Sequence, residues 1–235
     1  MSEQAREVEQ QLIQFSARLS ERLEQLVLPL LEPGQAGKKQ LDSAAVFRES
    51  SLALAGRVME FLDRRRDLQE TRILVLENGT GFLARRLAES GEVDVVSAAP
   101  SEKLAELASR LSSYPNIIFR SFNPYPTTEE FDLIVGTGIL ACYPKETAKV
   151  LLQSLAAFCR RKIITELPLY TPWLRRIFHR ERVTAGSEGG LELSRFNRRE
   201  IFEIMENACG LLISEQRTQA GKMIFKAIRK AHPAT

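Results

Sequence analysis

The sequence predicts an α/β protein: an open, mostly parallel sheet with a C-terminal antiparallel hairpin, preceded by a pair of N-terminal helices. Three observations predict this fold class. From Arg72 onward, short apolar runs alternate with amphipathic helical patterns, which is typical of a parallel sheet covered by helices on both faces. A turn that contains Gly79 and Gly81 follows the first apolar run. The last two runs, 211–217 and 222–229, are separated only by Thr-Gln-Ala-Gly and indicate a hairpin.

The chain begins with two amphipathic helical patterns. Residues 4–31 carry apolar side chains at steps of three or four, with Glu, Gln and Arg between them, and predict the first helix. Breakers and charges in 32–43 indicate a loop, and a second helix is predicted over 44–65. We interpret 1–66 as a helical extension and 67–231 as the α/β domain. Two roles stay open for the helices: packing over their own sheet, or binding a protein partner or a second copy of the chain.

The remaining elements follow from apolar runs and helical periodicity. Strands are predicted at 72–76, 93–96, 117–122, 131–135 and 162–166. Helices are predicted at 82–90, 102–111, 145–158 and 200–208. Because helices separate most of these strands, parallel pairing is expected, since parallel neighbours need a crossover connection.

Composition places the chain among ordinary globular proteins. Hydrophobic residues make up 44% and charged residues 27% of the 235 residues, enough for a sizeable core. The formal net charge of +3 is too small to indicate a nucleic-acid partner. Three scattered cysteines and two histidines argue against a disulfide framework and against a metal site. Because the sequence lacks a signal peptide's apolar core and a long apolar stretch, we expect a cytoplasmic protein without a transmembrane segment.

The segment 168–195 is distinctive, and we interpret it as a cap or lid. Within 168–182, apolar and aromatic side chains are interleaved with basic ones. This mixture suits a flat acidic ligand, peripheral contact with an anionic membrane or an acidic partner; it also suits an amphipathic lid helix with a solvated basic face. The candidate substrate-binding residues are Tyr143, which follows the fourth strand, Trp173, Arg176 and His179. The tyrosine fits a packing role as well.

The order of strands, glycine turn and hairpin resembles class I S-adenosylmethionine-dependent methyltransferases, which have a Rossmann-like fold. Residues 72–88, Arg-Ile-Leu-Val-Leu-Glu-Asn-Gly-Thr-Gly-Phe-Leu-Ala-Arg-Arg-Leu-Ala, look like that family's first strand, glycine turn and first helix. Phe-Asp-Leu-Ile-Val at 131–135 resembles its fourth strand, and Phe-Asn-Arg-Arg-Glu-Ile at 196–201 resembles the turn before its last helix. More weakly, Leu-Pro-Leu-Tyr-Thr-Pro-Trp-Leu at 167–174 and Gln-Ala-Gly-Lys-Met-Ile-Phe at 219–225 resemble magnesium-protoporphyrin O-methyltransferases.

This resemblance implies a site for S-adenosylmethionine. After a strand, glycines let the backbone approach a ligand closely and the helix start offers free N–H groups, roles that Gly79 and Gly81 would fill. The implied cofactor-binding residues are Glu77, Asn78, Gly79, Gly81, Ser97 and Asn123. The turn is two residues shorter than the family's usual turn. The second strand ends without the family's ribose-binding acid, and Asn123 stands where the family has an acid that reads adenine.

The sequence leaves two main functions open. The first is an S-adenosylmethionine-dependent methyltransferase that acts on a small, flat, acidic molecule. No side chain is identified as catalytic, because methyl transfer to an ionised carboxylate depends on positioning rather than on a general base. The second is a non-catalytic pseudoenzyme of this fold that has lost cofactor binding and serves as a partner or scaffold subunit. RNA modification is a weaker third reading, because no aromatic and basic platform precedes the sheet.

Overall fold

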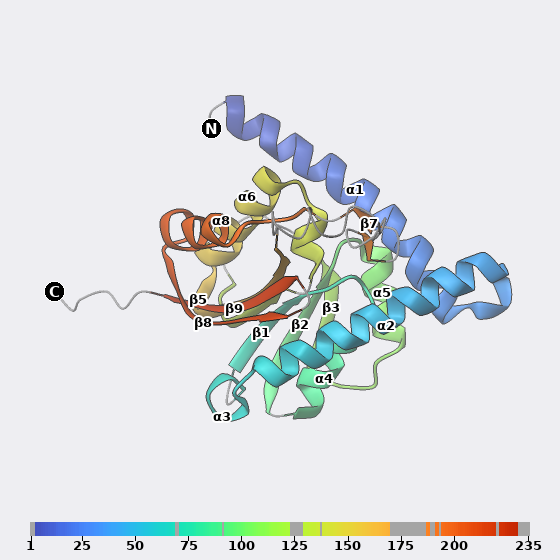
Figure 1. Cartoon of the computed structure of the whole chain (residues 1–235). Helices are drawn as coiled ribbons and strands as arrows, with labels where there is room; N and C mark the ends of the chain where they lie inside the picture. The colour runs from blue at the N-terminus through green and yellow to red at the C-terminus, as the bar shows by residue number, and fades with distance from the viewer. Residues whose placement is uncertain are drawn as a thin grey trace.

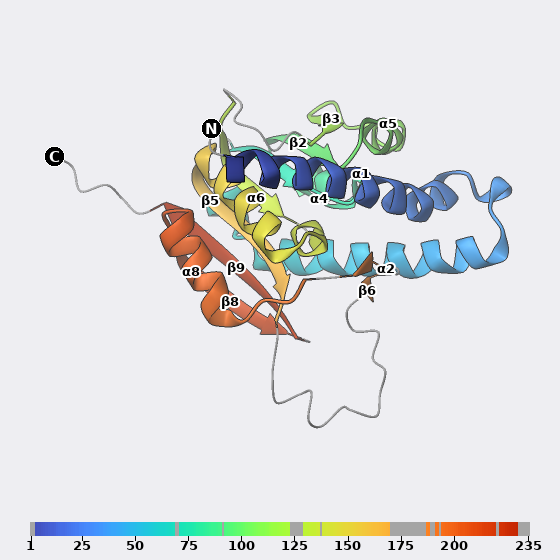
Figure 2. The ribbon, with the colours of Figure 1, turned by 90° about the horizontal axis from the view of Figure 1, so that it is seen from above.

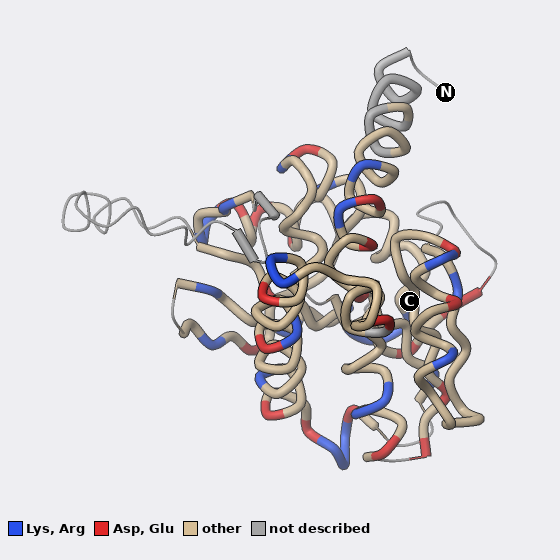
Figure 3. Tube along the Cα trace, turned by 90° about the vertical axis from the view of Figure 1, so that its right-hand side faces the viewer, with Lys and Arg blue, Asp and Glu red and all other residues tan. Residues whose placement is uncertain are grey.

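Figure 1 shows the computed structural model of the chain, in which helices flank one central sheet. The structure describes residues 3–68, 71–90, 92–122, 129–136, 138–169, 187–188, 191–192, 194–219 and 221–229. Figure 3 shows basic and acidic residues interspersed along these segments, in keeping with the small net charge of +3. Within these segments, no helix combines the length and the apolar character that crossing a membrane requires.

The central sheet has seven strands in the order β3-β2-β1-β4-β5-β9-β8. Its strands are β1 (Thr71–Leu76), β2 (Val93–Ala99), β3 (Ile117–Ser121), β4 (Phe131–Gly136), β5 (Cys159–Pro168), β8 (Leu211–Gln219) and β9 (Lys222–Arg229). The first five run parallel, and β9 pairs antiparallel with both β5 and β8. The predicted sheet with its terminal hairpin is therefore confirmed. A separate pair, β6 (Ser187–Glu188) and β7 (Leu191–Glu192), was not predicted.

The N-terminal helix pair consists of α1 (Glu3–Leu31) and α2 (Lys38–Phe61), joined through the 3-10 turn η1 (Pro33–Gln35). The prediction of a loop over 32–43 is wrong in its second half, because α2 begins at Lys38. Gly37 N donates a hydrogen bond of 3.0 Å to the side-chain oxygen of Gln40. This bond satisfies a backbone N–H at the start of the helix, so the lysines that follow extend the helix rather than the loop.

The predicted second helix is also interrupted before its predicted end. Leu62 has an extended backbone, with ψ of 132°. Asp63 then accepts a hydrogen bond of 3.1 Å from Arg65 N and begins the short helix α3 (Arg64–Asp67). Such a side-chain cap favours a new helix start over continuation of the old helix.

The other helices agree closely with the sequence prediction. They are α4 (Phe82–Ser90), α5 (Glu102–Arg110), α6 (Lys145–Ala157) and α8 (Arg198–Glu203), with a 3-10 turn η2 (Gly138–Cys142) and a π-helical turn η3 (Ile204–Ala208). The predicted helix at 200–208 corresponds to α8 continued by η3.

Two apolar cores lie on opposite faces of the sheet. Leu74 and Leu76 of β1 belong to one core, whereas Ile73 and Val75, which point the other way, belong to the second. Helices α1, α6 and α8 contribute to the first core, and α4 contributes to the second. Helix α2 contributes to both, with Phe47 in the first core and its second half in the other. Figure 1 shows α1 and α2 meeting at the η1 connection and diverging from it toward the sheet. In both Figure 1 and Figure 2, this connection lies on the side of the molecule away from β8 and β9.

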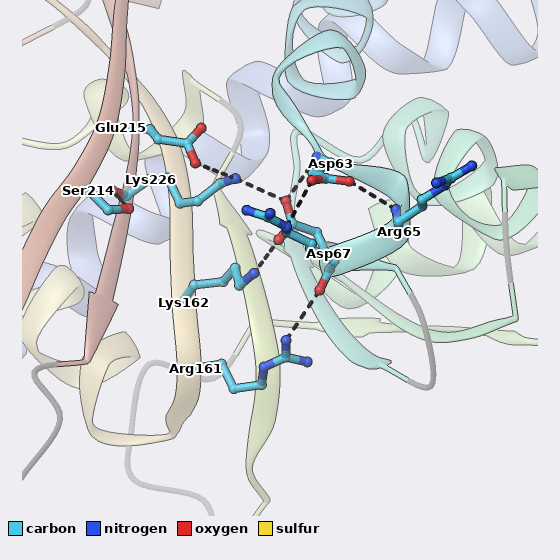
Figure 4. Close-up of polar contacts among 9 residues, drawn as sticks. Asp63, Arg65, Asp67, Arg161, Lys162, Ser214, Glu215 and Lys226 are labelled. Carbon is cyan, nitrogen blue, oxygen red and sulfur yellow. Dashed lines mark hydrogen bonds and ion pairs between the residues drawn. The ribbon is translucent and has the colours of Figure 1, made fainter.

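A cluster of buried charged side chains links α3, which follows the helix pair, to the sheet. Asp67, only 1% exposed, is hydrogen-bonded by Lys162 of β5 and lies 3.1 Å from Lys226 Nζ of β9. Figure 4 shows both lysines pointing at the carboxylate. Burial alone would raise the pKa of Asp67, but hydrogen bonds from the lysines and from Asp63 N together outweigh burial, and the pKa is lowered. Lys226 also lies 3.4 Å from Glu215 of β8.

Candidate functional site

The strand order reverses between β1 and β4, and open α/β sheets bind ligands outside the carboxyl ends of their strands at such a switch point. Here β1 ends at Leu76 and β4 at Gly136. The turn after β1 leads from Glu77 into α4, and its glycines Gly79 and Gly81 have positive φ angles of 89° and 67°. These backbone angles are open to glycine and costly for other residues. The predicted glycine turn is therefore present.

This glycine turn packs directly against α5. A Cβ atom at Gly79 would lie 2.9 Å from the side chain of Leu104, which is fully buried. A Cβ atom at Gly81 would lie 3.5 Å from Ala108, one turn further along α5, and 2.8 Å from the guanidinium of Arg85. The missing side chains thus make room for a neighbouring helix, and Leu104 occupies the space next to Gly79.

Glu77 turns its carboxyl group inward, beneath the start of α4. The residue is 2% exposed, and its Oε1 accepts hydrogen bonds from Ser97 Oγ at 3.0 Å and from Ala84 N at 3.3 Å. Burial raises the pKa of this carboxyl group, although both hydrogen bonds favour its ionised form. Ala84 lies in the first turn of α4, so the chain's own carboxyl group takes an N–H group that a helix start otherwise offers to an anionic ligand.

Asn78 joins the turn to α2 and stabilises it internally. Its Nδ2 donates to Ser51 Oγ at 2.8 Å, and its Oδ1 accepts from Thr80 Oγ1 at 2.9 Å. The amide nitrogen and the amide oxygen are thus both engaged inside the protein. Asn78 therefore contributes to the shape of the turn rather than presenting a free polar group at the switch point.

The end of β2 offers no carboxylate. Ser97 donates its hydroxyl to Glu77, and the strand then ends with the buried residues Ala98 and Ala99. The acid that would accept hydrogen bonds from a ribose diol is absent from this strand end. Asn123, the remaining implied cofactor residue, lies outside the described part of the chain.

Helix α1 lies over the same edge of the sheet. Ser20 Oγ donates to Pro100 O at 2.9 Å, in the loop that follows β2. Glu24 accepts from Ser101 Oγ at 3.1 Å and lies 2.9 Å from Lys103 Nζ. The α1 side chains buried in the core that contains the ends of β1 and β2 are Leu19, Leu23, Leu26 and Val27. Helix α1 therefore covers the carboxyl edge with apolar side chains and is held there by polar contacts.

Tyr143 follows η2 and packs against α1. It is 3% exposed, its ring centroid lies 5.3 Å from that of Phe15, and its hydroxyl is 3.2 Å from Ser16 Oγ, within hydrogen-bond distance. Burial raises the pKa of the Tyr143 hydroxyl and raises the pKa of the neighbouring Cys142 thiol to about 12. A small apolar pocket beside the ring is bounded by strand-end and η2 side chains, including Leu140. The tyrosine thus belongs to the contact between α1 and the body of the protein.

The other three candidate substrate residues, Trp173, Arg176 and His179, lie outside the described residues. Within the described ranges, no group of His, Cys, Asp and Glu side chains is arranged to hold a metal ion. The structure therefore brings together Glu77, Asn78 and the two glycines in one turn, with Ser97 of β2 hydrogen-bonded to Glu77 and Tyr143 nearby under α1.

Sequence reasoning missed two sets of contacts around this edge. Glu166 of β5, 3% exposed, accepts two hydrogen bonds from Arg57 of α2 at 2.7 and 2.9 Å. A carboxylate at the end of an apolar strand is expected to have a cationic partner, because buried carboxylates are rarely left unpaired. The sequence alone does not identify which residue that partner is. The sequence did contain a pattern that could have predicted the polar contacts of α1, because Ser16 and Ser20 lie one helical turn apart on a helix rich in leucine.

Comparison by sequence finds no match, either to a protein-family model or to a curated protein. Comparison of the fold with solved structures finds several. Magnesium protoporphyrin IX methyltransferase (ChlM) from Synechocystis PCC 6803, with bound SAH, is 18% identical with a TM-score of 0.61, covering 83% of this chain and 89% of that chain. A SAM-dependent methyltransferase from Methanosarcina mazei is 15% identical with a TM-score of 0.56, covering 73% and 96%. The mitomycin 7-O-methyltransferase MmcR is 15% identical with a TM-score of 0.61, covering 77% and 54%.

These similarities show that the chain has the class I methyltransferase fold, as its strand order and glycine turn predicted. At this level of identity they show the fold alone, so the site has to be judged from its own residues. For S-adenosylmethionine, the described residues do not fit: the start of α4 is already capped by Glu77, and β2 ends in Ala99. Leu104 and α1 fill the adjoining space with apolar side chains.

Proposed function

We propose that the protein is a non-catalytic member of this fold, one that does not use S-adenosylmethionine at its switch point and acts by binding another protein. The observation that carries this proposal is the internal use of Glu77. Its buried carboxyl group accepts hydrogen bonds from Ser97 and Ala84 at the position where a ligand would meet the start of α4. The turn is thereby completed by the protein's own atoms.

Electrostatics support this proposal. S-adenosylmethionine carries a carboxylate, and the Ala84 N–H that the start of α4 would offer to it already donates to Glu77 Oε1. The cofactor's ribose would also meet Ala98 and Ala99 instead of an acid. Charge-assisted hydrogen bonds of that kind contribute roughly 1.5–3 kcal/mol each. Their absence alone lowers affinity by an order of magnitude or more.

The covering helix supports the proposal as well. Ser20 and Glu24 hold α1 to the loop after β2, while Leu23 is 1% exposed in the core below. A ligand at this edge would have to displace buried leucines and break these polar contacts. The free energy of that opening would be subtracted from any binding free energy.

A methyltransferase acting on a small, flat, acidic molecule is the second candidate. It is favoured by the likeness to ChlM, solved with bound SAH, over 83% of this chain. The apolar and basic side chains of 168–182 would then receive the acidic substrate, and S-adenosylmethionine would be the methyl donor. This candidate requires α1 to leave the carboxyl edge before the cofactor enters.

Calorimetric titration of the purified protein with S-adenosylmethionine and with S-adenosylhomocysteine separates the two candidates. We expect no binding heat at ligand concentrations up to about 1 mM, a ceiling that corresponds to roughly 4 kcal/mol of binding free energy. Micromolar binding would overturn the first proposal and favour the second, provided that Gly79→Arg abolishes it. Circular dichroism must then show that the variant still folds, because Leu104 crowds this position.

Binding to another protein is tested on the chain purified gently from its own cells through a tag. Light scattering on the purified material should give a mass above the 26.5 kDa of the single chain. A monomer that also fails to bind S-adenosylhomocysteine would contradict the proposed partner role. If the first candidate fails instead, flat carboxylic acids are the molecules to screen for methyl transfer.

A further inference from the structure

Four exposed arginines from two distant parts of the chain meet at the amino edge of the sheet. Arg64, Arg65 and Arg66 are consecutive residues of α3, and Arg161 lies near the start of β5. Arg161 Nη2 donates a hydrogen bond of 3.2 Å to Arg66 O, which joins the strand to the helix although 95 residues separate the two arginines. We call these four residues the arginine patch.

The guanidinium groups of the arginine patch are largely available for binding. Within the described part of the chain, no side-chain hydrogen bond or ion pair engages Arg64 or Arg65. Arg65 contributes only its backbone N–H, and Figure 4 shows its guanidinium directed away from the buried Asp67. Arg66 has a side chain that is 84% exposed, and Arg161 uses one N–H group and has further donors.

The acids around the arginine patch do not neutralise it. Asp63 lies 3.5 Å from one of the four arginines, and Glu130 is paired at 2.6 Å with a different arginine, outside the patch. Glu60 lines a pocket with two further arginines. The Asp67 cluster holds two acids and two lysines and is neutral as a whole. Glu70, the next acid along the chain, lies outside the described residues; counted together with Asp63, it still leaves the patch positive.

This surplus of positive charge indicates an anionic partner. Like charges at close range repel each other, so a cluster of arginines without counter-charges costs free energy in the isolated protein. An anion that binds there removes this repulsion. The planar guanidinium group matches the geometry of carboxylate and phosphate oxygens, to which it donates two parallel hydrogen bonds.

The neighbouring surface separates one kind of anion from another. An open groove of about 470 Å³ beside the patch is lined by Glu92, Asp94 and Asp132, together with Arg72 and uncharged residues. Asp132 belongs to β4, the strand that pairs with β5, so this acidic groove adjoins the arginine patch. A long polyanion such as RNA, or the plane of an anionic bilayer, would meet like charges in the groove. A short acidic segment of a protein can contact the arginines alone.

We propose that the arginine patch is the docking surface for an acidic segment of a partner protein. This inference rests on the proposed function, which supplies a protein partner, and adds the surface and the chemistry of the contact. Carboxylates of the segment accept hydrogen bonds from Arg64, Arg65 and Arg161. The patch lies beside the start of β5 and before β1, whereas the glycine turn follows the end of β1, so docking does not depend on S-adenosylmethionine.

Fluorescence anisotropy of a labelled oligoglutamate peptide, titrated with the full-length protein, tests this docking surface. At about 50 mM salt, we expect a dissociation constant on the order of 100 μM, because each exposed ion pair contributes little alone. The affinity should fall as salt is added, since exposed charges are screened.

Two charge-matched double variants locate the binding. Arg64→Glu with Arg65→Glu should weaken peptide binding about tenfold. Lys38→Glu with Lys39→Glu, at exposed positions at the start of α2, changes the net charge equally and should leave the affinity within about twofold of wild type. Circular dichroism should show that both variants fold as wild type does, because their altered side chains are exposed.

Three results would overturn the proposal. The first is no peptide binding to wild-type protein at low salt, and the second is an equal loss of binding in the two double variants. The third is tighter binding of a single-stranded oligouridylate of the same charge, which would assign the patch to nucleic acid. Binding of S-adenosylhomocysteine, measured by calorimetry, would contradict the proposed function and leave these results unchanged, so the two failures are distinguishable.

Discussion

Glu77 completes the glycine turn with its own buried carboxyl group, and its titration should be measurable. Burial raises the pKa of its carboxyl group above the ordinary value of 4.5. A raised folded-state pKa contributes stability below the unfolded-state pKa, and this contribution is lost as the pH rises through the folded-state pKa. Glu77 therefore stabilises the folded state less at high pH than at low pH.

We predict that Glu77→Gln becomes more stable relative to wild type as the pH rises above the ordinary carboxyl pKa of 4.5, because the folded-state pKa of Glu77 is raised. The amide oxygen of glutamine accepts the same two hydrogen bonds from Ser97 and Ala84 without a buried charge. Thermal melts at several pH values measure the difference. Glu106→Gln, on the exposed side of α5, is the control and should show no such trend. A difference that is flat with pH would contradict the prediction.

Both the positive φ angle at Gly79 and the neighbouring Leu104 disfavour any other residue at this position. We predict that Gly79→Ala destabilises the protein by about 2–5 kcal/mol, from about 1–2 kcal/mol for the left-handed backbone plus about 1–3 kcal/mol for crowding against Leu104. Gly210→Ala isolates the first contribution, because Gly210 has φ of 66° and open space around it. Urea unfolding measures both variants. Equal losses would mean that α5 does not press on the turn in solution.

At the scale of the element, α1 packs over the carboxyl edge of the sheet. We predict that Leu23→Ala, at a position 1% exposed, costs about 2–5 kcal/mol of unfolding free energy. Ile13→Ala, on the same helix but 55% exposed, should stay within about 0.5 kcal/mol of wild type. The comparison is made by urea unfolding under identical conditions. If the two variants behave alike, α1 is not packed over the edge as described.

The elements that sequence could predict are those whose signal is local. Helix α4 was placed at its observed bounds because a glycine turn and an amphipathic run define both of its ends. The start of α2 was missed because Pro33, Gly34 and Gly37 suggest a loop, whereas the deciding contact is the Gly37–Gln40 hydrogen bond. The π-helical turn η3 was read as ordinary helix, since both have similar apolar spacing.

The candidate site was predictable only in part. The strand order placed the switch point, and the glycine turn marked it, because both follow from patterns along the chain. The sequence gives no sign that Glu77 bonds to Ser97, twenty residues away, rather than to a ligand. Nor does it reveal that α1 returns to the loop at Pro100, eighty residues distant in sequence. Such contacts depend on tertiary packing, which no local pattern encodes.

At the scale of the whole molecule, the N-terminal helices are joined to the sheet and its loops at several separate places. Ser20 and Glu24 join α1 to the loop after β2, and Arg57 joins α2 to Glu166 of β5. The buried Asp67 cluster joins α3 to β5 and β9. Because these contacts reach the loop after β2 as well as strands β5 and β9, and because both cores include helices of the pair, we expect the helices and the sheet to unfold together in one transition.

The Asp67 cluster provides the test of that coupling. We predict that Asp67→Asn lowers the unfolding free energy at pH 7 by about 3–5 kcal/mol, because Lys162 and Lys226 lose their buried partner. Since the folded-state pKa of Asp67 is lowered, the wild-type advantage is present above its ordinary value of 3.8 and is lost as the pH falls through the folded-state pKa. Urea unfolding from pH 7 down to about pH 2.5 measures this advantage across the relevant window. Asp94→Asn, on the exposed side of β2, is the matched control and should change little. If the α1 and sheet signals are lost together in wild type but at different urea concentrations in Asp67→Asn, the cluster couples the unfolding of the two parts. A single transition with wild-type stability in the variant would contradict this role.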